Sequence, residues 1–239
     1  MNTRLQTLLP TVASIAVGII PVFILIHYFG VSRKLIIGWG VLSYVVGVTA
    51  FKLPVYHLFV VRLLHGKLSN VWLSVSHGFV SAISELGAAF LFFILVVPEL
   101  TLTELIGFGI AAGAVEAIML PFIQNPLKGT PLEEHSSEVL QRSSANRLIP
   151  WMSVLERALA LLPHVATRGL VYISFISGNM IPAVLAVLTF ALIDGRAYFA
   201  HLEKWSFDDI GVLVQIYRDL ALVGISQTLL FALFYYYLV

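Results

Sequence analysis

The feature that most constrains this chain is the length of its apolar runs. Stretches of about 20 predominantly apolar residues, the length needed to cross a hydrocarbon core of roughly 30 Å, follow one another along most of the sequence. Of the 239 residues, 59% are hydrophobic and 11% are charged, whereas soluble domains contain about 25% charged residues. The sequence therefore predicts an all-α, polytopic bundle of about seven transmembrane helices, folded as a single integral membrane domain over residues 1–239.

Short polar breaks divide the apolar runs and locate the expected helices. We place them near residues 6–29, 35–64, 71–97, 102–123, 148–175, 180–198 and 220–239. The second run contains Pro54, whose ring and missing N–H are expected to kink the helix and to leave Lys52 near an interface. Residues 124–147 have the composition of a polar solvated loop, and residues 196–219 mix charged with apolar side chains as amphipathic interfacial segments do.

The basic residues of the loops predict the orientation, because Lys and Arg accumulate on the cytoplasmic side. With seven spans, one side of the membrane has only Arg33 and Lys34. The other side collects Arg4, Arg62, Lys67, Lys128, Arg142, Arg147, Arg196, Lys204 and Arg218. We therefore expect the N-terminus and the 124–147 loop to be cytoplasmic. The first apolar run lacks an A-x-A-like cleavage site, so we expect it to be retained as a span.

Composition also excludes several classes of partner and chemistry. The net charge is +1 and no long basic tract exists, so nucleic acid is not an expected partner. The chain contains no cysteine, which excludes disulfides, thiolate metal ligands and a cysteine nucleophile. Membrane lipids and other membrane protein subunits are the expected partners.

Ionisable residues inside the predicted spans are the strongest functional signal, because a charge at mid-membrane costs about 2.5–3.5 kcal/mol even on lenient scales. Glu85 lies midway along the third span and Glu116 well inside the fourth. In the fifth span Arg157, His164 and Arg168 are seven and four residues apart, so they share one helical face. We predict a buried polar network whose members are Glu85, Glu116, Glu156, Arg157, His164, Arg168 and Asp194.

The residues alone leave three interpretations of this network open. Its members can pair across helices and fix the packing of the bundle. Alternatively, Glu85, Glu116 and His164 are zinc-ligand types on three different helices, although no short-range metal motif supports them. Finally, buried carboxylates with Arg and His can relay protons or bind transported ions, although no internal repeat is visible.

Five landmarks along the chain resemble the YhfC-like family of intramembrane metalloproteases, which are distant relatives of the CAAX-type prenyl endopeptidases. The landmarks are Phe51-Lys52-Leu53-Pro54, Ser84-Glu85-Leu86-Gly87-Ala88, Glu116-Ala117-Ile118 at the end of a Gly-rich segment, Glu156-Arg157 followed by His164, and Asp194 at the end of residues 189–194. The resemblance covers most of the chain. It implies an intramembrane-metalloprotease-like bundle in a prokaryotic-type cell membrane.

The chain departs from this family at positions that carry activity. Where the family has a glutamate, an arginine and two histidines, this sequence has Ser84, Ala88, Ala112 and Phe190. A serine cannot replace a carboxylate as general base, and neither Ala nor Phe can bind zinc. The resemblance therefore implies a catalytically degenerate protein without a cofactor that acts as a scaffold, binding or accessory subunit of a membrane assembly.

An active metal-dependent intramembrane peptidase with altered ligands is the alternative. In that enzyme Glu85 would be the catalytic base, and zinc would be held by His164 and Glu116, or by these two together with Glu85. His77, seven residues before Ser84 on the same helical face, is a further ligand type. A transporter or ion-binding protein is the third reading.

Overall fold

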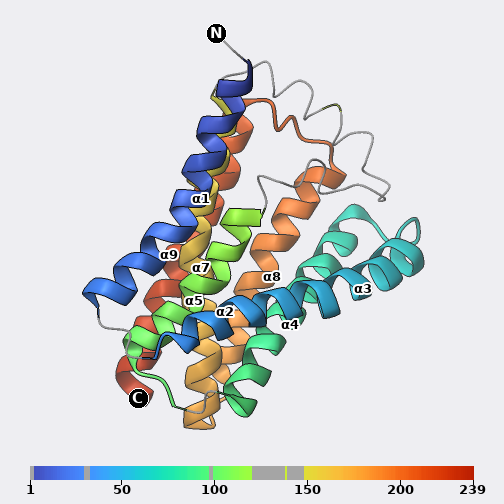
Figure 1. Ribbon diagram of the computed structural model, residues 1–239. Helices are drawn as coiled ribbons and strands as arrows, with labels where there is room; N and C mark the ends of the chain where they lie inside the picture. The colour runs from blue at the N-terminus through green and yellow to red at the C-terminus, as the bar shows by residue number, and fades with distance from the viewer. Residues whose placement is uncertain (1–2, 30–32, 97–98, 120–137, 139–147) are drawn as a thin grey trace.

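The computed structural model describes residues 3–29, 33–96, 99–119, 138 and 148–239 (Figure 1). Every regular secondary-structure element in these ranges is a helix. Seven of the described helices are long and apolar enough to cross a membrane. The predicted all-α, polytopic fold is confirmed.

The helices follow the predicted apolar runs closely. They are α1 (Thr3–Tyr28), α2 (Leu35–Val46), η1 (Gly47–Lys52), α3 (Leu53–Val55), η2 (Tyr56–Leu64), α4 (Asn70–Leu95), α5 (Leu102–Met119), α7 (Ile149–Ser177), α8 (Ile181–Leu202) and α9 (Ile210–Leu238). The elements from α2 to η2 form one spanning unit. The predicted loop 124–147 lies outside the described residues except for residue 138, as does the end of the predicted span 102–123.

The segment 196–219 forms the end of α8 and the beginning of α9, so only residues 203–209 connect the two helices. This corrects the prediction of a separate interfacial segment. One pair of its charges is satisfied within the bundle, because Arg196 Nη2 lies 3.5 Å from Asp219 Oδ2. The same guanidinium lies over Trp205, 4.3 Å from the ring centroid. Because Arg196 and Asp219 are paired, α8 continues past Arg196 and α9 begins well before Asp219.

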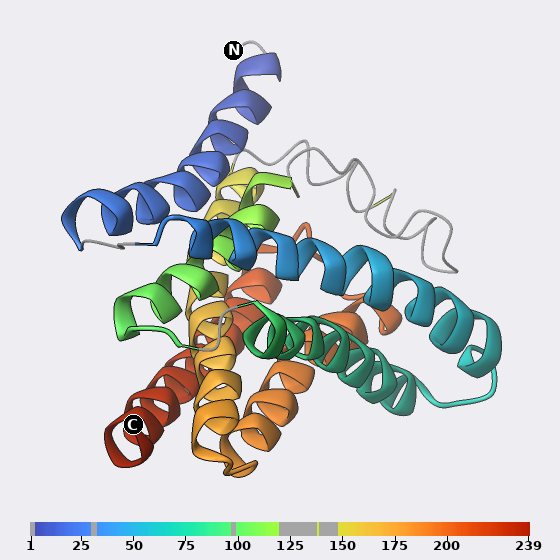
Figure 2. The same ribbon diagram turned by 60° about the horizontal axis from the view of Figure 1, so that its bottom comes forward.

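The spanning unit of residues 35–64 stays helical through Pro54. On both sides of the proline the backbone forms π-helical turns, η1 and η2, in place of α-helical ones. We attribute these wide turns to the proline, whose ring and missing N–H disrupt the ordinary hydrogen-bond ladder. The unit runs crosswise to α1 in Figures 1 and 2. It carries Lys52, at the end of η1, into the bundle.

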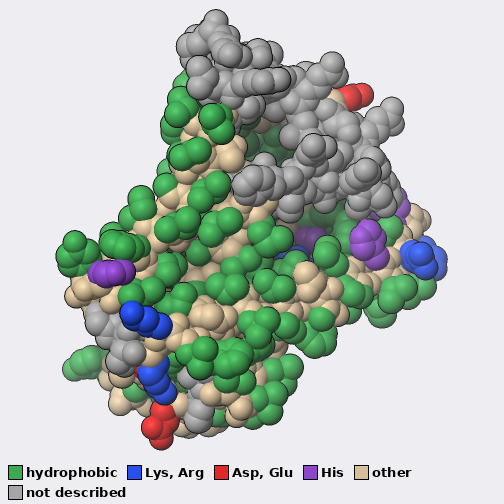
Figure 3. Space-filling model, viewed as in Figure 1, with side chains coloured by type: hydrophobic (Ala, Val, Ile, Leu, Met, Phe, Trp, Pro, Cys, Tyr) green, Lys and Arg blue, Asp and Glu red, His purple; other side chains and the backbone are tan. Residues whose placement is uncertain are grey.

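Helix α7 lies at the centre of the bundle (Figure 2). Its most apolar stretch is 61% buried, compared with 17% for α9. Leu170 and Ile173 of α7 belong to one core cluster with Phe93 of α4 and Phe108 of α5. The described part of the face in Figure 3 is largely apolar, as expected for a surface that contacts lipid. Polar side chains of the spans are therefore concentrated inside, along α7.

Two glycines allow the closest contacts between the backbones of neighbouring helices. A Cβ atom on Gly78 of α4 would lie 2.1 Å from the carbonyl oxygen of Ala191 in α8. A Cβ atom on Gly40 of α2 would lie 2.4 Å from the carbonyl oxygen of Phe108 in α5. Small residues let helix backbones approach closely in membranes, where packing replaces the hydrophobic driving force. Helices α4 and α8 thus meet backbone to backbone beside the polar site.

The start of α5 carries a capping box that sequence analysis did not identify. The backbone N–H of Thr101 donates to Glu104 Oε2 at 3.0 Å, and the backbone N–H of Glu104 donates to Thr101 Oγ1 at 3.3 Å. Arg33 donates to the two carboxylate oxygens at 2.7 and 2.8 Å, and this hydrogen bonding raises the pKa of Arg33. The Thr-x-x-Glu spacing is the signal that would have predicted the cap.

Candidate functional site

A cavity of about 650 Å³ lies inside the bundle. Its polar lining consists of Lys52, Tyr56, His77, Glu85, Glu116, Glu156, Arg157, His164, Asp194, Arg196, Tyr198, His201, Tyr217 and Asp219. Six of the seven residues predicted as a polar network line it, and the seventh, Arg168, is fully buried. Figure 3 shows histidine and basic side chains in a recess of an otherwise largely apolar face.

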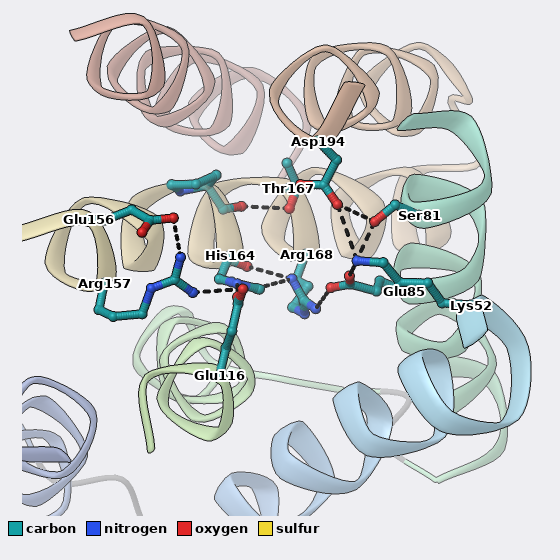
Figure 4. Close-up of polar contacts among 11 residues, drawn as sticks. Lys52, Ser81, Glu85, Glu116, Glu156, Arg157, His164, Thr167, Arg168 and Asp194 are labelled. Carbon is teal, nitrogen blue, oxygen red and sulfur yellow. Dashed lines mark hydrogen bonds and ion pairs between the residues drawn. The ribbon is translucent and has the colours of Figure 1, made fainter. Parts of the chain in front are cut away.

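Helix α7 provides the axis of the site. Figure 4 shows Arg157, His164 and Arg168 along this helix, each in contact with a carboxylate or with the next member of the row. Their spacing of seven and four residues corresponds to nearly whole turns at 3.6 residues per turn. The predicted shared face is therefore the face that meets α5 and α4.

Glu85 is the centre of one half of the site. Lys52 Nζ lies 2.9 Å from Glu85 Oε1 and 3.2 Å from Asp194 Oδ2. Arg168 Nη2 lies 3.3 Å from Glu85 Oε2. Ser81 donates a hydrogen bond to Asp194 and lies 3.4 Å from Glu85 Oε1. Each oxygen of Glu85 therefore faces a cation, in a residue that is 2% exposed.

His164 joins this half to the second half of the site. Its Nδ1 lies 2.8 Å from Arg168 Nη1, and its Nε2 lies 2.7 Å from Glu116 Oε2. Because a guanidinium can only donate, Nδ1 accepts, and Nε2 carries the proton donated to Glu116. Arg157 Nη1 lies 2.7 Å from Glu116 Oε1, and Arg157 also pairs with Glu156. His164 is thus neutral in this arrangement.

The chain of contacts carries an excess of negative charge. Its carboxylates are Asp194, Glu85, Glu116 and Glu156, and its cations are Lys52, Arg168 and Arg157. Four acids against three cations, with a neutral His164, leave one negative charge, which lies in the half where Glu116 and Glu156 share Arg157. The neighbouring Asp219 pairs with both Arg196 and Arg218, so this group adds one positive charge beside the chain of contacts. The half around Glu85 is balanced, because the two acids Glu85 and Asp194 face the two cations Lys52 and Arg168.

The structure brings all seven predicted network residues into this chain of contacts. Sequence analysis missed two further members, Lys52 and Ser81. Lys52 does not lie at an interface, as the sequence suggested, but pairs with acids inside the bundle. A lysine within a 30-residue apolar helix was the available signal. Ser81 lies one turn before Glu85, and no feature of the sequence distinguishes it from the other serines of α4.

The three predicted zinc ligands do not converge on one coordination position. Glu116 and His164 are in contact, whereas the guanidinium of Arg168 stands between His164 and Glu85 and bonds to both. Within the described part of the chain, no group of three or more His, Asp or Glu side chains could hold a metal ion. A site built from these three ligands would require Arg168 to move away.

The positions that depart from the resembled family lie in the same interior. Phe190 lines the cavity, and its ring lies edge-on to His164 with the centroids 6.1 Å apart. Ala88, Ala112 and Ser84 are all buried. None of the four brings an ionisable group to the site, so the acids and bases that remain pair with one another.

Comparison with known proteins does not extend this picture. The chain matches no protein-family model, no curated protein and no solved structure. Function is therefore inferred from the geometry of the site.

Proposed function

We propose that this chain is a non-hydrolytic membrane protein, similar in design to intramembrane metalloproteases, that serves as a ligand-binding or accessory subunit of a membrane assembly. The observation that carries the proposal is the position of Arg168 between Glu85 and His164, at 3.3 and 2.8 Å. A metallopeptidase needs ligands that are free to bind a metal and a carboxylate that is free to activate water. In this site the Arg168 guanidinium lies where the metal and its water would have to bind, and the acids are ion-paired.

The cavity supports a binding role. Its volume of about 650 Å³ falls within the roughly 300–1,000 Å³ typical of small-molecule sites. Apolar side chains such as Phe190 and Ile193 line it together with the charged groups. Such a lining suits a ligand with both a polar and an apolar part.

We place the protein in a prokaryotic-type cell membrane with its N-terminus in the cytoplasm. Support for the orientation comes from the positive-inside rule, since alternating seven spans in chain order assigns Arg62, Lys67 and Lys204 to the same side of the membrane as the start of α1. The cavity extends from Glu85, midway along α4, toward His201 on that same side. On this orientation the cavity is directed to the cytoplasmic side.

The first test is metal content and peptidase activity of the full chain in lipid nanodiscs. We expect substoichiometric zinc and no hydrolysis of peptide substrates, because Arg168 occupies the position that a metal and its water would need. Metal analysis of protein purified in zinc-containing buffer and a fluorogenic peptide assay measure the two quantities.

One tightly bound zinc per chain, together with hydrolysis that Glu85→Gln abolishes, would overturn the proposal. That result would establish the active peptidase instead, with Glu85 as the base and Glu116 and His164 as ligands. Glu203→Gln is the control, because Glu203 is an exposed carboxylate bonded to Asn70.

A further inference from the structure

Three aromatic side chains that line the cavity, the aromatic trio of His77, Tyr56 and Tyr198, leave polar groups unpaired. The His77 ring stacks on Tyr198 with centroids 4.3 Å apart and lies edge-on to Tyr56 at 5.0 Å. Nδ1 of His77 is buried and has no hydrogen-bond partner among the described residues. The tyrosine hydroxyls lie 3.1 Å apart, and their bond uses one of two O–H protons. The other proton has no acceptor in the described part of the chain. Unpaired polar groups in a protein interior are destabilising, so the trio favours a hydrogen-bonding ligand.

The group that satisfies the aromatic trio must both accept and donate hydrogen bonds. It must accept the free tyrosine O–H proton. Toward His77 it must donate if Nδ1 is bare and accept if Nδ1 carries a proton, because a neutral imidazole has one nitrogen of each kind. A hydroxyl has one proton and two lone pairs, so it fits either tautomer. An ammonium group only donates, and a carboxylate only accepts.

The charges beside the trio favour a neutral ligand. Asp194 lies one turn before Tyr198 on α8, so the trio borders the ion pairs around Glu85. In these pairs Glu85 and Asp194 face Lys52 and Arg168, which are two acids against two cations. A charged head would add an unmatched charge inside the membrane, whereas a hydroxyl adds none.

The cavity also reaches the outer surface between α8 and α9. Leu192 of α8 and Leu222 of α9 both line it, and each is 58% exposed. Leu192 is six residues from Tyr198 on α8, a distance of about 9 Å at roughly 1.5 Å per residue. A dodecyl chain is longer than this. With its head beside the trio, such a chain would extend through the opening into lipid.

Two links between α8 and α9 set the length of this opening. Arg196 pairs with Asp219 at 3.5 Å on one side, and Gln227 donates to Thr189 at 2.9 Å on the other. Along α8 the links are about 10 Å apart, at roughly 1.5 Å per residue. A helix with its side chains is about 10–12 Å wide, so it would not pass between them. A single hydrocarbon chain is much thinner and fits.

We propose that the cavity binds a neutral, single-chain membrane lipid with a hydroxyl head, of which a long-chain alcohol is the simplest case. The hydroxyl lies beside the aromatic trio, where it accepts the free tyrosine proton and bonds to His77. The tail leaves between Leu192 and Leu222. This inference rests on the proposed binding function and names its ligand class.

The test uses a dodecanol analogue with a photoreactive diazirine in its chain, added to the full protein in nanodiscs. Irradiation fixes the bound probe, and mass spectrometry of the peptides distinguishes it from probe dissolved in the bilayer. We expect saturable labelling around Leu192 and Leu222 that dodecanol displaces. Dodecane, dodecylamine and dodecanoate have the same chain length but lack a neutral hydroxyl, and should compete at least about fivefold less well.

A pair of variants locates the head. His77→Phe keeps a stacked ring but removes its nitrogens, and should weaken binding of the dodecanol probe about fivefold, the loss expected for one neutral hydrogen bond. Ser76→Ala is the control at the adjacent position, where the hydroxyl bonds the Trp72 carbonyl of its own helix. It should bind the probe as the wild type does.

A second pair of variants tests the lateral opening. Leu192→Trp should narrow the opening and reduce labelling by the dodecanol probe several-fold, because the tail then has no exit. Leu188→Trp is the control, one turn away on the same exposed face of α8. It should leave labelling unchanged.

Two outcomes would overturn the hydroxyl site: dodecane or either charged analogue competing as well as dodecanol, or His77→Phe binding with unchanged affinity. The competitor series uses the wild-type protein, so it decides the question even if His77→Phe does not fold. A protein that is free of zinc and inactive on peptides but is not labelled by the probe would refute this inference and leave the proposed function intact. Stoichiometric zinc with peptide hydrolysis would refute the proposed function itself.

Discussion

Glu85→Leu is expected to lower the free energy of unfolding by about 3–5 kcal/mol, the loss typical of removing one partner of a buried ion pair. Arg168, whose side chain is 0% exposed, would lose its carboxylate and keep its contacts to His164, which is neutral. The variant would therefore contain a buried cation without a counter-charge, which is destabilising. Reversible unfolding in mixed micelles, followed by circular dichroism, measures the change.

The double variant Glu85→Leu, Arg168→Met is expected to recover much of this loss. Replacing both members of a buried ion pair by apolar side chains of similar volume is often neutral or stabilising. Glu203→Gln removes an exposed carboxylate and should change stability by no more than about 0.5 kcal/mol. If Glu85→Leu were as mild as this control, Glu85 would not hold the buried pairing described above.

Gly78→Ala is expected to destabilise the protein by about 3 kcal/mol, the upper end of the range for overpacking. The added methyl group would lie 2.1 Å from the carbonyl oxygen of Ala191. A backbone oxygen cannot turn aside as a flexible side chain can, so α4 and α8 must separate. Separation would also pull Ser81 away from Asp194, so the polar site would be disturbed together with the packing. The same unfolding measurement applies.

Gly87→Ala is the matched control for this substitution. Gly87 lies nine residues farther along α4, and a Cβ atom there would meet nothing within 4 Å. Since Ala favours helix over Gly by about 1 kcal/mol, the control should be neutral or stabilising. Equal destabilisation by the two substitutions would mean that α4 and α8 do not pack at Gly78.

The position of Arg168 gives both Glu85 and His164 a partner within the protein. Its guanidinium neutralises Glu85 and donates to His164, as a bound cation between the same two groups would. Unlike a metal ion, a guanidinium offers no open coordination position for water. Through this pairing Arg168 joins α7 to α4.

Sequence patterns were informative wherever a property depends on neighbours along one helix. The apolar runs located the spans, and helical spacing placed Arg157, His164 and Arg168 on one face. The same reasoning failed for Lys52, because its depth depends on how residues 35–64 cross the bundle past Pro54. It also failed for residues 196–219, where pairing of Arg196 with Asp219 across two helices keeps both helical.

The sequence by itself determined the environment of this protein. Long apolar runs require lipid, and the acids and bases within these runs must be buried inside the helix bundle. The tertiary structure alone decided which of these groups meet. Glycine contacts bring α4 against α8, and the 35–64 helix crosses the bundle, so that Lys52 reaches Glu85 and Asp194 while Arg168 separates Glu85 from His164. Charge pairing acts over a few ångströms, and such distances between helices follow from packing, which no pattern within a single helix records.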